Sequence, residues 1–116
     1  MYANGFGLLR ELELHEEAGF NPLKVIQHAT GNNARILGMQ DKIGSVRPGY
    51  MADLIVVNGN PLENIKVLYP ALAPGQNTGV EWTIKDGYVY HAPTLAKEVR
   101  EMVAKARAAG ATKSTR

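Results

Sequence analysis

The chain has three histidines, and their spacing does not build a metal site. Imidazole ligands are usually brought to one face by an H-x-x-x-H helix or an H-x-H strand, and neither pattern occurs. We interpret His15 as solvated among the charged positions of a helix, and His28 as a cation favoured near a helix C-terminus. His91 is placed opposite Trp82 in a predicted hairpin, where ring stacking is expected. A structural role is preferred for His28 and His91 and a solvated position for His15, with a chemical role as the alternative for each.

Carboxylates and hydroxyls assemble no catalytic set either. Four glutamates crowd the surface of the first helix, whereas acid/base work needs a carboxyl in a pocket. Asp53 is the exception, because a charged residue opens an apolar strand there. We predict that it hydrogen-bonds turn amides near Pro48-Gly49, and catalysis is the alternative. Ser45 and Ser114 are the only serines, and neither has a G-x-S-x-G setting. No catalytic residue is therefore assigned.

Composition excludes several classes of protein. The chain has 116 residues, 45% hydrophobic and 21% charged, which is typical of one globular domain. A net charge of +2 with dispersed basic residues predicts no nucleic-acid partner. The absence of cysteine excludes disulfides and thiolate sites. The longest apolar run, Leu54–Val57, is too short for a membrane span, so we expect a cytoplasmic protein with no membrane partner.

Helical periodicity dominates residues 1–40. Leucines recur at helical spacing until Gly19, a typical C-terminal stop. Asn21-Pro22 then provides an N-cap and a first helical residue. Thr30 is predicted to cap a third short helix that stops at Gly38. We expect three short helices in succession.

Residues 41–92 change to strand patterns. Pro48-Gly49 predicts a type II turn, and the run Ala52–Val57 predicts a strand buried on both faces. Val80–Lys85 and Tyr88–His91 flank Asp86-Gly87, a type I′ hairpin signal. The predicted hairpin has one buried face, on which Ile84 lies opposite Val89, and one solvent-exposed face.

Residues 93–116 return to helical periodicity. The predicted helix ends at Gly110, and its opposite side is charged. Its apolar stripe comprises Leu95, Val99, Met102, Val103 and Ala106. The expected units are therefore residues 1–40, 41–92 and 93–116, the last being an amphipathic helix and tail.

A set of motifs in fixed order resembles one enzyme superfamily. Gly44–Val57, GSVRPGYMADLIVV, followed by Gly59–Leu62, resembles the G-x-(I/V)-x-P-G-x-x-A-D-(L/I) segment that closes amidohydrolase chains. Further segments resemble the flanking helices and final hairpin of imidazolonepropionase-like and Xaa-Pro-dipeptidase-like members. They are Arg10–Leu14, Ala18–Leu23, Ala29-Thr30, Asn33–Gly38 and Ile84–Val89. The resemblance covers about residues 6 to 91.

The resemblance implies an α+β fragment with the terminal helices of a (β/α)₈ barrel, part of a small β-sandwich and a C-terminal helix. Such a barrel takes roughly 250 residues and binds a divalent metal, expected to be zinc, whose hydroxide attacks an amide carbon. The family's ligands, among them an H-x-H pair and a last-strand Asp, would all lie before Met1. No catalytic residue, metal ligand or cofactor is thus assigned within this chain. Asn4, in the loop after the last barrel strand, is the one expected substrate contact.

The leading hypothesis is the C-terminal portion of a metal-dependent amidohydrolase that hydrolyses C–N bonds and is catalytically incomplete alone. The alternative is a non-enzymatic interaction module that completes another chain. A third possibility is a small enzyme that uses His15 or His28. The expected partner is the missing barrel portion or a second copy, because an open sheet edge and apolar surface favour association. We therefore expect a homo-oligomer.

Overall fold

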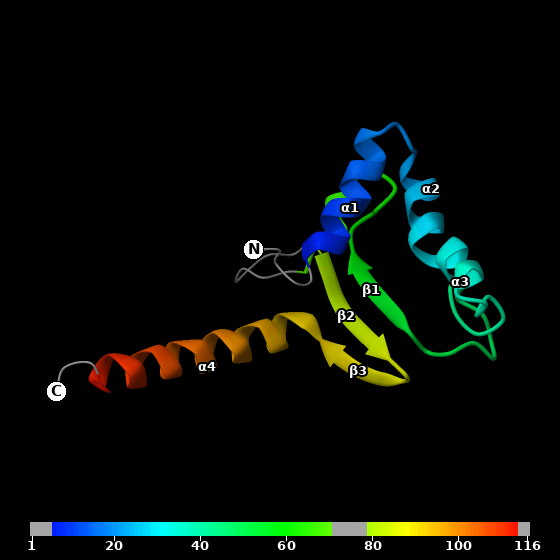
Figure 1. The fold of residues 1–116 in the computed structure, drawn as a ribbon. Helices are drawn as coiled ribbons and strands as arrows, with labels where there is room; N and C mark the ends of the chain where they lie inside the picture. Colours follow the sequence, from blue (N-terminus) through cyan, green and yellow to red (C-terminus); the bar gives the residue numbers. More distant parts are fainter. Residues whose placement is uncertain (1–5, 71–78, 114–116) are drawn as a thin grey trace.

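A computed structural model describes residues 6–70 and 79–113, which form helices and a three-stranded antiparallel sheet of order β1-β2-β3 (Figure 1). The predicted α+β class is confirmed in these residues. The elements in chain order are α1 (Phe6–Glu17), α2 (Pro22–Gln27), the π-helical turn η1 (His28–Asn32), α3 (Asn33–Ile36), β1 (Leu54–Asn58), the 3₁₀ turn η2 (Ile65–Leu68), β2 (Gly79–Lys85), β3 (Tyr88–His91) and α4 (Ala92–Lys113).

The end of α1 is set by Gly19, as the sequence predicts. Gly19 has a φ of +97°, a conformation that costs other residues more. Its N–H donates to the Glu16 carbonyl at 2.9 Å, and the Phe20 N–H donates to the His15 carbonyl at 3.2 Å. These two bonds form a Schellman motif that satisfies carbonyls of the last turn. The chain then turns back, and α2 packs beside α1 (Figure 1).

The predicted third helix is not a separate element. α2, η1 and α3 follow one another without a break, and Asn32 keeps helical angles of φ −71° and ψ −42°. The hydroxyl of Thr30 donates to the Ile26 carbonyl at 2.7 Å, inside the helical rod. The prediction that Thr30 caps a new helix is therefore wrong. Gly38, with φ +67°, ends the rod as predicted.

The N-terminus of α2 provides a direct stability test. Oδ1 of Asn21 accepts the Lys24 N–H at 2.9 Å, and Pro22 occupies the start of the helix. Asn21→Ala is expected to lower the free energy of unfolding by about 1 kcal/mol in urea denaturation, because one helix donor loses its acceptor. Asn33→Ala, an exposed change within α3, is the control and should cause no loss. Equal losses in both variants would contradict the capping role.

The hairpin follows the predicted register. Ile84 pairs with Val89, Lys85 with Tyr88, and the two turn residues both have positive φ, +52° at Asp86 and +82° at Gly87. Positive φ at both central positions defines a type I′ turn. β1 adds on the other edge of β2, with a register shift between Val56 and Val57. The hairpin prediction is confirmed.

The predicted burial of the strands is wrong for the described part of this chain. β1 was expected to be covered on both faces, yet Ile55 and Val56 are exposed. Val89, expected on the core face of the hairpin, is 61% exposed. An apolar run indicates only that a strand is suited to burial, and the covering layers must come from elsewhere in the fold.

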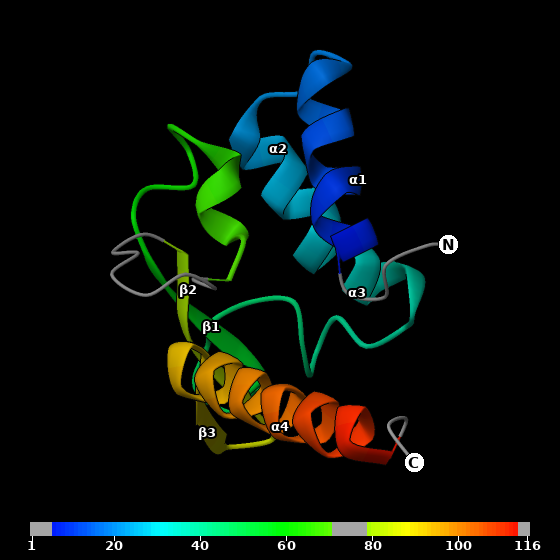
Figure 2. The same cartoon turned by 90° about the vertical axis from the view of Figure 1, so that its left-hand side faces the viewer.

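The core lies between the helices and η2 rather than on the sheet. Leu12 of α1, Val25 of α2 and Ile65 of η2 are buried together. Figure 2 shows η2 beside the α1–α2 pair. Partly buried side chains surround this cluster, namely Leu9, Ile26, Ala29 and Leu68. A segment that follows β1 thus holds the two helices together.

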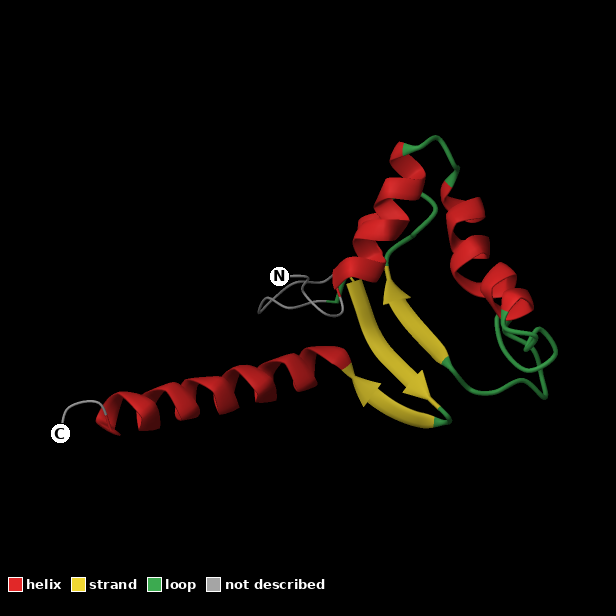
Figure 3. Cartoon of the chain, in the orientation of Figure 1, coloured by secondary structure: helices red, strands yellow, loops and turns green. Residues whose placement is uncertain are grey.

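The last helix is longer than predicted. α4 runs to Lys113 and passes through Gly110, which was expected to end it. A single glycine inside a helix costs only about 1 kcal/mol relative to alanine, so it weakens a helix without stopping it. α4 contacts β2 and β3 and then extends away from the sheet (Figures 1 and 3).

Candidate functional site

Two histidines and a phenylalanine pack together at the turn between α1 and α2. The ring centroids of His15 and His28 are 6.0 Å apart, and Phe20 meets their edges at 6.0 and 5.1 Å. His15 is half-buried, and its Nδ1 is buried without a hydrogen-bond partner in the structure. The prediction that His15 is solvated is wrong, because the Schellman turn folds Phe20 back over the last turn of α1. His28 was expected near a helix C-terminus, but it lies in the middle of the continuous rod, where its ring packs against His15 and Phe20.

The divalent metal implied by the sequence resemblance does not fit these residues. Among residues 6–70 and 79–113, no three His, Cys, Asp or Glu side chains come close enough to hold an ion. Zinc sites in proteins use at least three protein ligands. The imidazoles of His15 and His28 face an apolar ring instead of a third donor.

His91 stacks on Trp82 as predicted. The two residues are directly paired between β2 and β3, and their ring centroids are 4.4 Å apart. Nδ1 of His91 lies 2.7 Å from the hydroxyl oxygen of Thr94, in the first turn of α4. This histidine therefore connects the hairpin with the helix that follows it.

Asp53 has a structural role, but its partners are not those predicted. We expected the amides near Pro48-Gly49. The structure instead places Oδ1 of Asp53 2.8 Å from the donating backbone N–H of Asp86, and Oδ2 2.7 Å from Nζ of Lys85. The carboxylate therefore connects the start of β1 to the tip of the hairpin. The Lys85 ammonium and the Asp86 N–H lower the pKa of Asp53 below its ordinary value of 3.8.

That lowered pKa predicts a pH dependence for Asp53→Asn. A carboxyl with a depressed folded-state pKa adds stability that is present above its unfolded-state pKa and is lost as pH falls through the folded-state value. The variant should be less stable than the unmodified chain at neutral pH. The difference between their urea midpoints should shrink as the pH falls below 3.8. Glu11→Gln, on the exposed side of α1, is the matched control. A difference for Asp53→Asn that does not change with pH would contradict this role.

The Pro48-Gly49 turn brings a cationic and an aromatic side chain together. Gly49 has φ +86°, and the Tyr50 N–H donates to the Arg47 carbonyl at 3.2 Å, as expected for the predicted type II turn. The Arg47 guanidinium carbon lies 5.9 Å from the centroid of the Tyr50 ring, within cation–π range.

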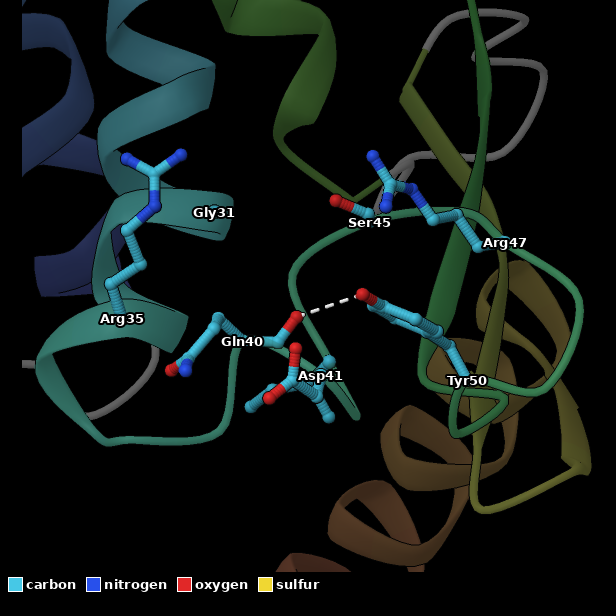
Figure 4. A pocket seen from close by; sticks show the side chains of 8 residues that line it. Gly31, Arg35, Gln40, Asp41, Ser45, Arg47 and Tyr50 are labelled. Carbon is cyan, nitrogen blue, oxygen red and sulfur yellow. Dashed lines mark hydrogen bonds between the residues drawn. The ribbon is translucent and has the colours of Figure 1, made fainter.

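An open polar cavity of about 230 Å³ lies between this turn and the helical rod (Figure 4). The Tyr50 hydroxyl donates to the Gln40 carbonyl at 2.9 Å across one side. The lining residues are Gly31, Arg35, Gln40, Asp41, Ile43, Ser45, Arg47 and Tyr50. No histidine lines the cavity, so Ser45 has no imidazole to activate it. The arrangement can attract polar groups and offers no nucleophile–base pair.

Sequence reasoning did not identify this cavity. Arg35 lies in α3 and Arg47 in the loop that follows the rod, and the path of that loop brings both to the cavity, on opposite sides of it in Figure 4. The one available signal was the short spacing of Arg47 and Tyr50 around a Pro-Gly turn. Asn4, the expected substrate contact, lies outside the described residues. Of the helices that the structure describes, none is long and apolar enough to cross a membrane.

The sequence is similar to short parts of an ochratoxinase and of an adenine deaminase. An ochratoxinase from Aspergillus niger is 45% identical over 53 residues, which are 45% of this chain and 11% of that protein. Adenine deaminase 4 from Rhizobium meliloti (strain 1021) is 45% identical over 40 residues, 34% of this chain and 7% of that protein. The chain therefore spans a small part of the curated relatives that it matches.

Solved structures extend the similarity to the fold. A crystal structure of a Xaa-Pro dipeptidase with bound methionine in the active site matches with a TM-score of 0.60 and 40% identity. The match covers 72% of this chain and 18% of the dipeptidase chain. An amidohydrolase crystal structure matches with the same TM-score and 37% identity, over 72% of this chain and 19% of that one. The model of the amidohydrolase family matches residues 3–89. Because this match spans most of the sequence, the chain belongs to the amidohydrolase family.

Proposed function

We propose that this chain is the C-terminal part of a metal-dependent amidohydrolase that hydrolyses C–N bonds of an amide, peptide or cyclic amide through a metal-activated water. The observation that carries the proposal is the match in both fold and sequence to a Xaa-Pro dipeptidase, at 40% identity over 72% of the chain. The similarity to an ochratoxinase supports the same class. A dipeptide-type substrate is the form of the proposal that the dipeptidase similarity favours.

In this proposal the chain has a structural part in the enzyme and is catalytically incomplete alone. The described residues do not hold the metal, because no three donors converge among them. The helices α1–α3 would be the last helices of the barrel, and the sheet would be part of a composite β-sandwich. Apolar side chains that point to solvent support this role, since a barrel would cover Leu8, Leu23 and Ile36. Asn4 remains the proposed substrate contact.

The purified chain tests catalytic incompleteness directly. We expect less than one metal ion per chain by elemental analysis and no turnover of dipeptide or amide substrates with added zinc. Stoichiometric metal together with turnover that a chelator abolishes would contradict incompleteness. In that case His15→Ala and His28→Ala would show whether the histidine cluster forms a small active site.

The DNA before the Met1 codon tests whether the chain is part of a longer amidohydrolase. An in-frame barrel with an H-x-H pair and a last-strand Asp supports that proposal, and a start signal at Met1 contradicts it.

A second candidate function is a non-enzymatic module that completes another chain. The observation that favours it is α4, which lies beyond the family match at residues 3–89 and has an exposed apolar stripe. A start signal at Met1 would favour this module. The two proposals share the expectation of self-association or association with a barrel portion.

A further inference from the structure

The apolar stripe of α4 faces solvent. Leu95 is 43% exposed and Met102 is 62% exposed, and Val99 and Val103 are also exposed. The main contacts of α4 with other elements are to β2 and β3, and the helix extends away from the sheet (Figure 1). Four large apolar side chains on one stripe of an exposed helix indicate a partner surface. The family match covers residues 3–89 and ends before α4 begins.

The spacing of the stripe is that of a coiled coil. Without Val103, which lies beside the seam, the residues of the stripe are spaced in alternating steps of four and three, which is the a/d pattern of a heptad repeat. The seam positions are Ala92, Leu95, Val99, Met102, Ala106 and Ala109. The helix has 22 residues and so is about 33 Å long, enough for three heptads. A second helix of the same spacing is therefore the partner that this surface fits.

The sizes of the seam residues favour an antiparallel pair. The large seam residues stand in the first half of the helix, and Ala106 and Ala109 are in the second half. A parallel pair would place Leu95 on Leu95 and leave only alanine layers at the far end. In an antiparallel pair Leu95 meets Ala106 of the second copy, and Val99 meets Met102. Each of the four inner layers then contains at least one large side chain, and only the outermost layers, Ala92 with Ala109, consist of alanine alone.

The charges beside the seam favour the same orientation. Glu98 and Lys105 flank it one heptad apart, and neither forms an ion pair among the described residues. In an antiparallel pair Glu98 of each copy lies beside Lys105 of the other, so the attraction occurs twice. In a parallel pair Glu98 would instead face Val103 of the second copy. On the other flank of an antiparallel pair, Ala96 lies beside Val103 of the second copy and extends the apolar contact.

We propose that α4 pairs antiparallel with α4 of a second copy of this chain, through the seam of Leu95, Val99, Met102 and Ala106 and the paired charges of Glu98 and Lys105. This dimer does not depend on whether the chain belongs to an active hydrolase. Its test therefore stays separate from the metal and activity assays.

Sedimentation equilibrium of the full chain over a range of concentrations tests the dimer. We expect a monomer–dimer equilibrium with a limiting mass of twice the 12.6 kDa of one chain. Met102→Glu places a charge in the central layer and should raise the dissociation constant at least about tenfold. A wild-type chain that stays monomeric overturns the proposal. An oligomer that keeps its mass in Met102→Glu also overturns it, because another surface then holds the copies together.

Charge exchange tests the orientation. Glu98→Lys and Lys105→Glu, each alone, turn two attractive contacts into two repulsive ones and should each raise the dissociation constant up to about tenfold at low salt. The double variant should restore wild-type affinity. Arg100→Glu, on the outer side of the helix, is the control and should leave affinity unchanged. These residues are all good helix formers, so far-UV circular dichroism should remain constant. The antiparallel arrangement is overturned if the single variants leave the dissociation constant unchanged. It is also overturned if the double variant does not restore the wild-type dissociation constant.

Discussion

Gly44→Ala is expected to lower the free energy of unfolding by about 2–5 kcal/mol, the sum of a backbone cost and a steric cost. Gly44 has φ +84°, where a residue with a Cβ is strained. A Cβ built there would lie 2.6 Å from the Cβ of Ala34, and 3.1 Å from both the Gly31 Cα and the Thr30 carbonyl oxygen. These neighbours belong to the helical rod, whose backbone cannot withdraw without disturbing its own hydrogen bonds. The lack of a side chain at Gly44 therefore allows the loop that follows the rod to pack closely against it.

Gly49→Ala separates the two costs. Gly49 has nearly the same backbone angle, φ +86°, but no atom lies within 4 Å of the position that its Cβ would take. This variant should lose only the backbone share, about 1–2 kcal/mol. Urea denaturation of both variants at one pH gives the comparison. Equal losses at Gly44 and Gly49 would show that the loop does not press on the rod.

Ile65→Ala is expected to lower the free energy of unfolding by about 2–5 kcal/mol, the usual cost of removing a large buried side chain. Ile65 is 3% exposed and packs against Leu12 and Val25, so its loss leaves a cavity between α1, α2 and η2. Because this core is small, few other contacts can compensate for the loss. We therefore also expect the contact between the helices and the segment after β1 to loosen.

An exposed isoleucine provides the control for this core. Ile36 is 82% exposed, so Ile36→Ala should change the free energy of unfolding by less than about 0.5 kcal/mol in the isolated chain. Thermal and urea unfolding of both variants measure the contrast. Similar losses at the two positions would contradict the location of the core. In a complex with a barrel portion, the proposal predicts that Ile36→Ala becomes destabilising as well.

The features predicted correctly are those that depend on residues close in sequence. Asn21 caps α2 through an N–H three residues away, and Gly19 ends α1 through the last carbonyls of that helix. Asp86-Gly87 determines the hairpin, and the register that follows from it brings Trp82 onto His91. Each rests on backbone angles that only certain residues adopt easily.

The wrong local predictions concern signals that are weak in energy. Thr30 was interpreted as a cap and Gly110 as a stop, yet both lie inside continuous helical segments. A threonine can hydrogen-bond to the carbonyl four residues earlier, and an isolated glycine costs less than a broken helix. The preference of one residue did not outweigh the hydrogen bonds of the turns around it.

The candidate site depends on contacts that no local pattern contains. The cavity is lined by Arg35 of α3 and by Arg47 of the loop after the rod, which only the tertiary fold brings together. Asp53 reaches Asp86 across 33 positions, and His15 is enclosed because Phe20 folds back over it. Sequence reasoning found the residue types and gave His15 and Asp53 the wrong surroundings.

The sequence by itself determined the end of α1 at Gly19, the cap of α2 at Asn21, the two turns, the hairpin register and the family motifs between residues 44 and 62. These features follow from short-range backbone preferences. Only the tertiary structure decided which apolar residues are buried. Leu12, Val25 and Ile65 come together into the core, whereas the equally apolar Ile55 and Met102 remain at the surface. Burial depends on which elements pack against one another. The hydrophobicity of a residue indicates that its burial would be favourable, but it does not indicate which element will bury it.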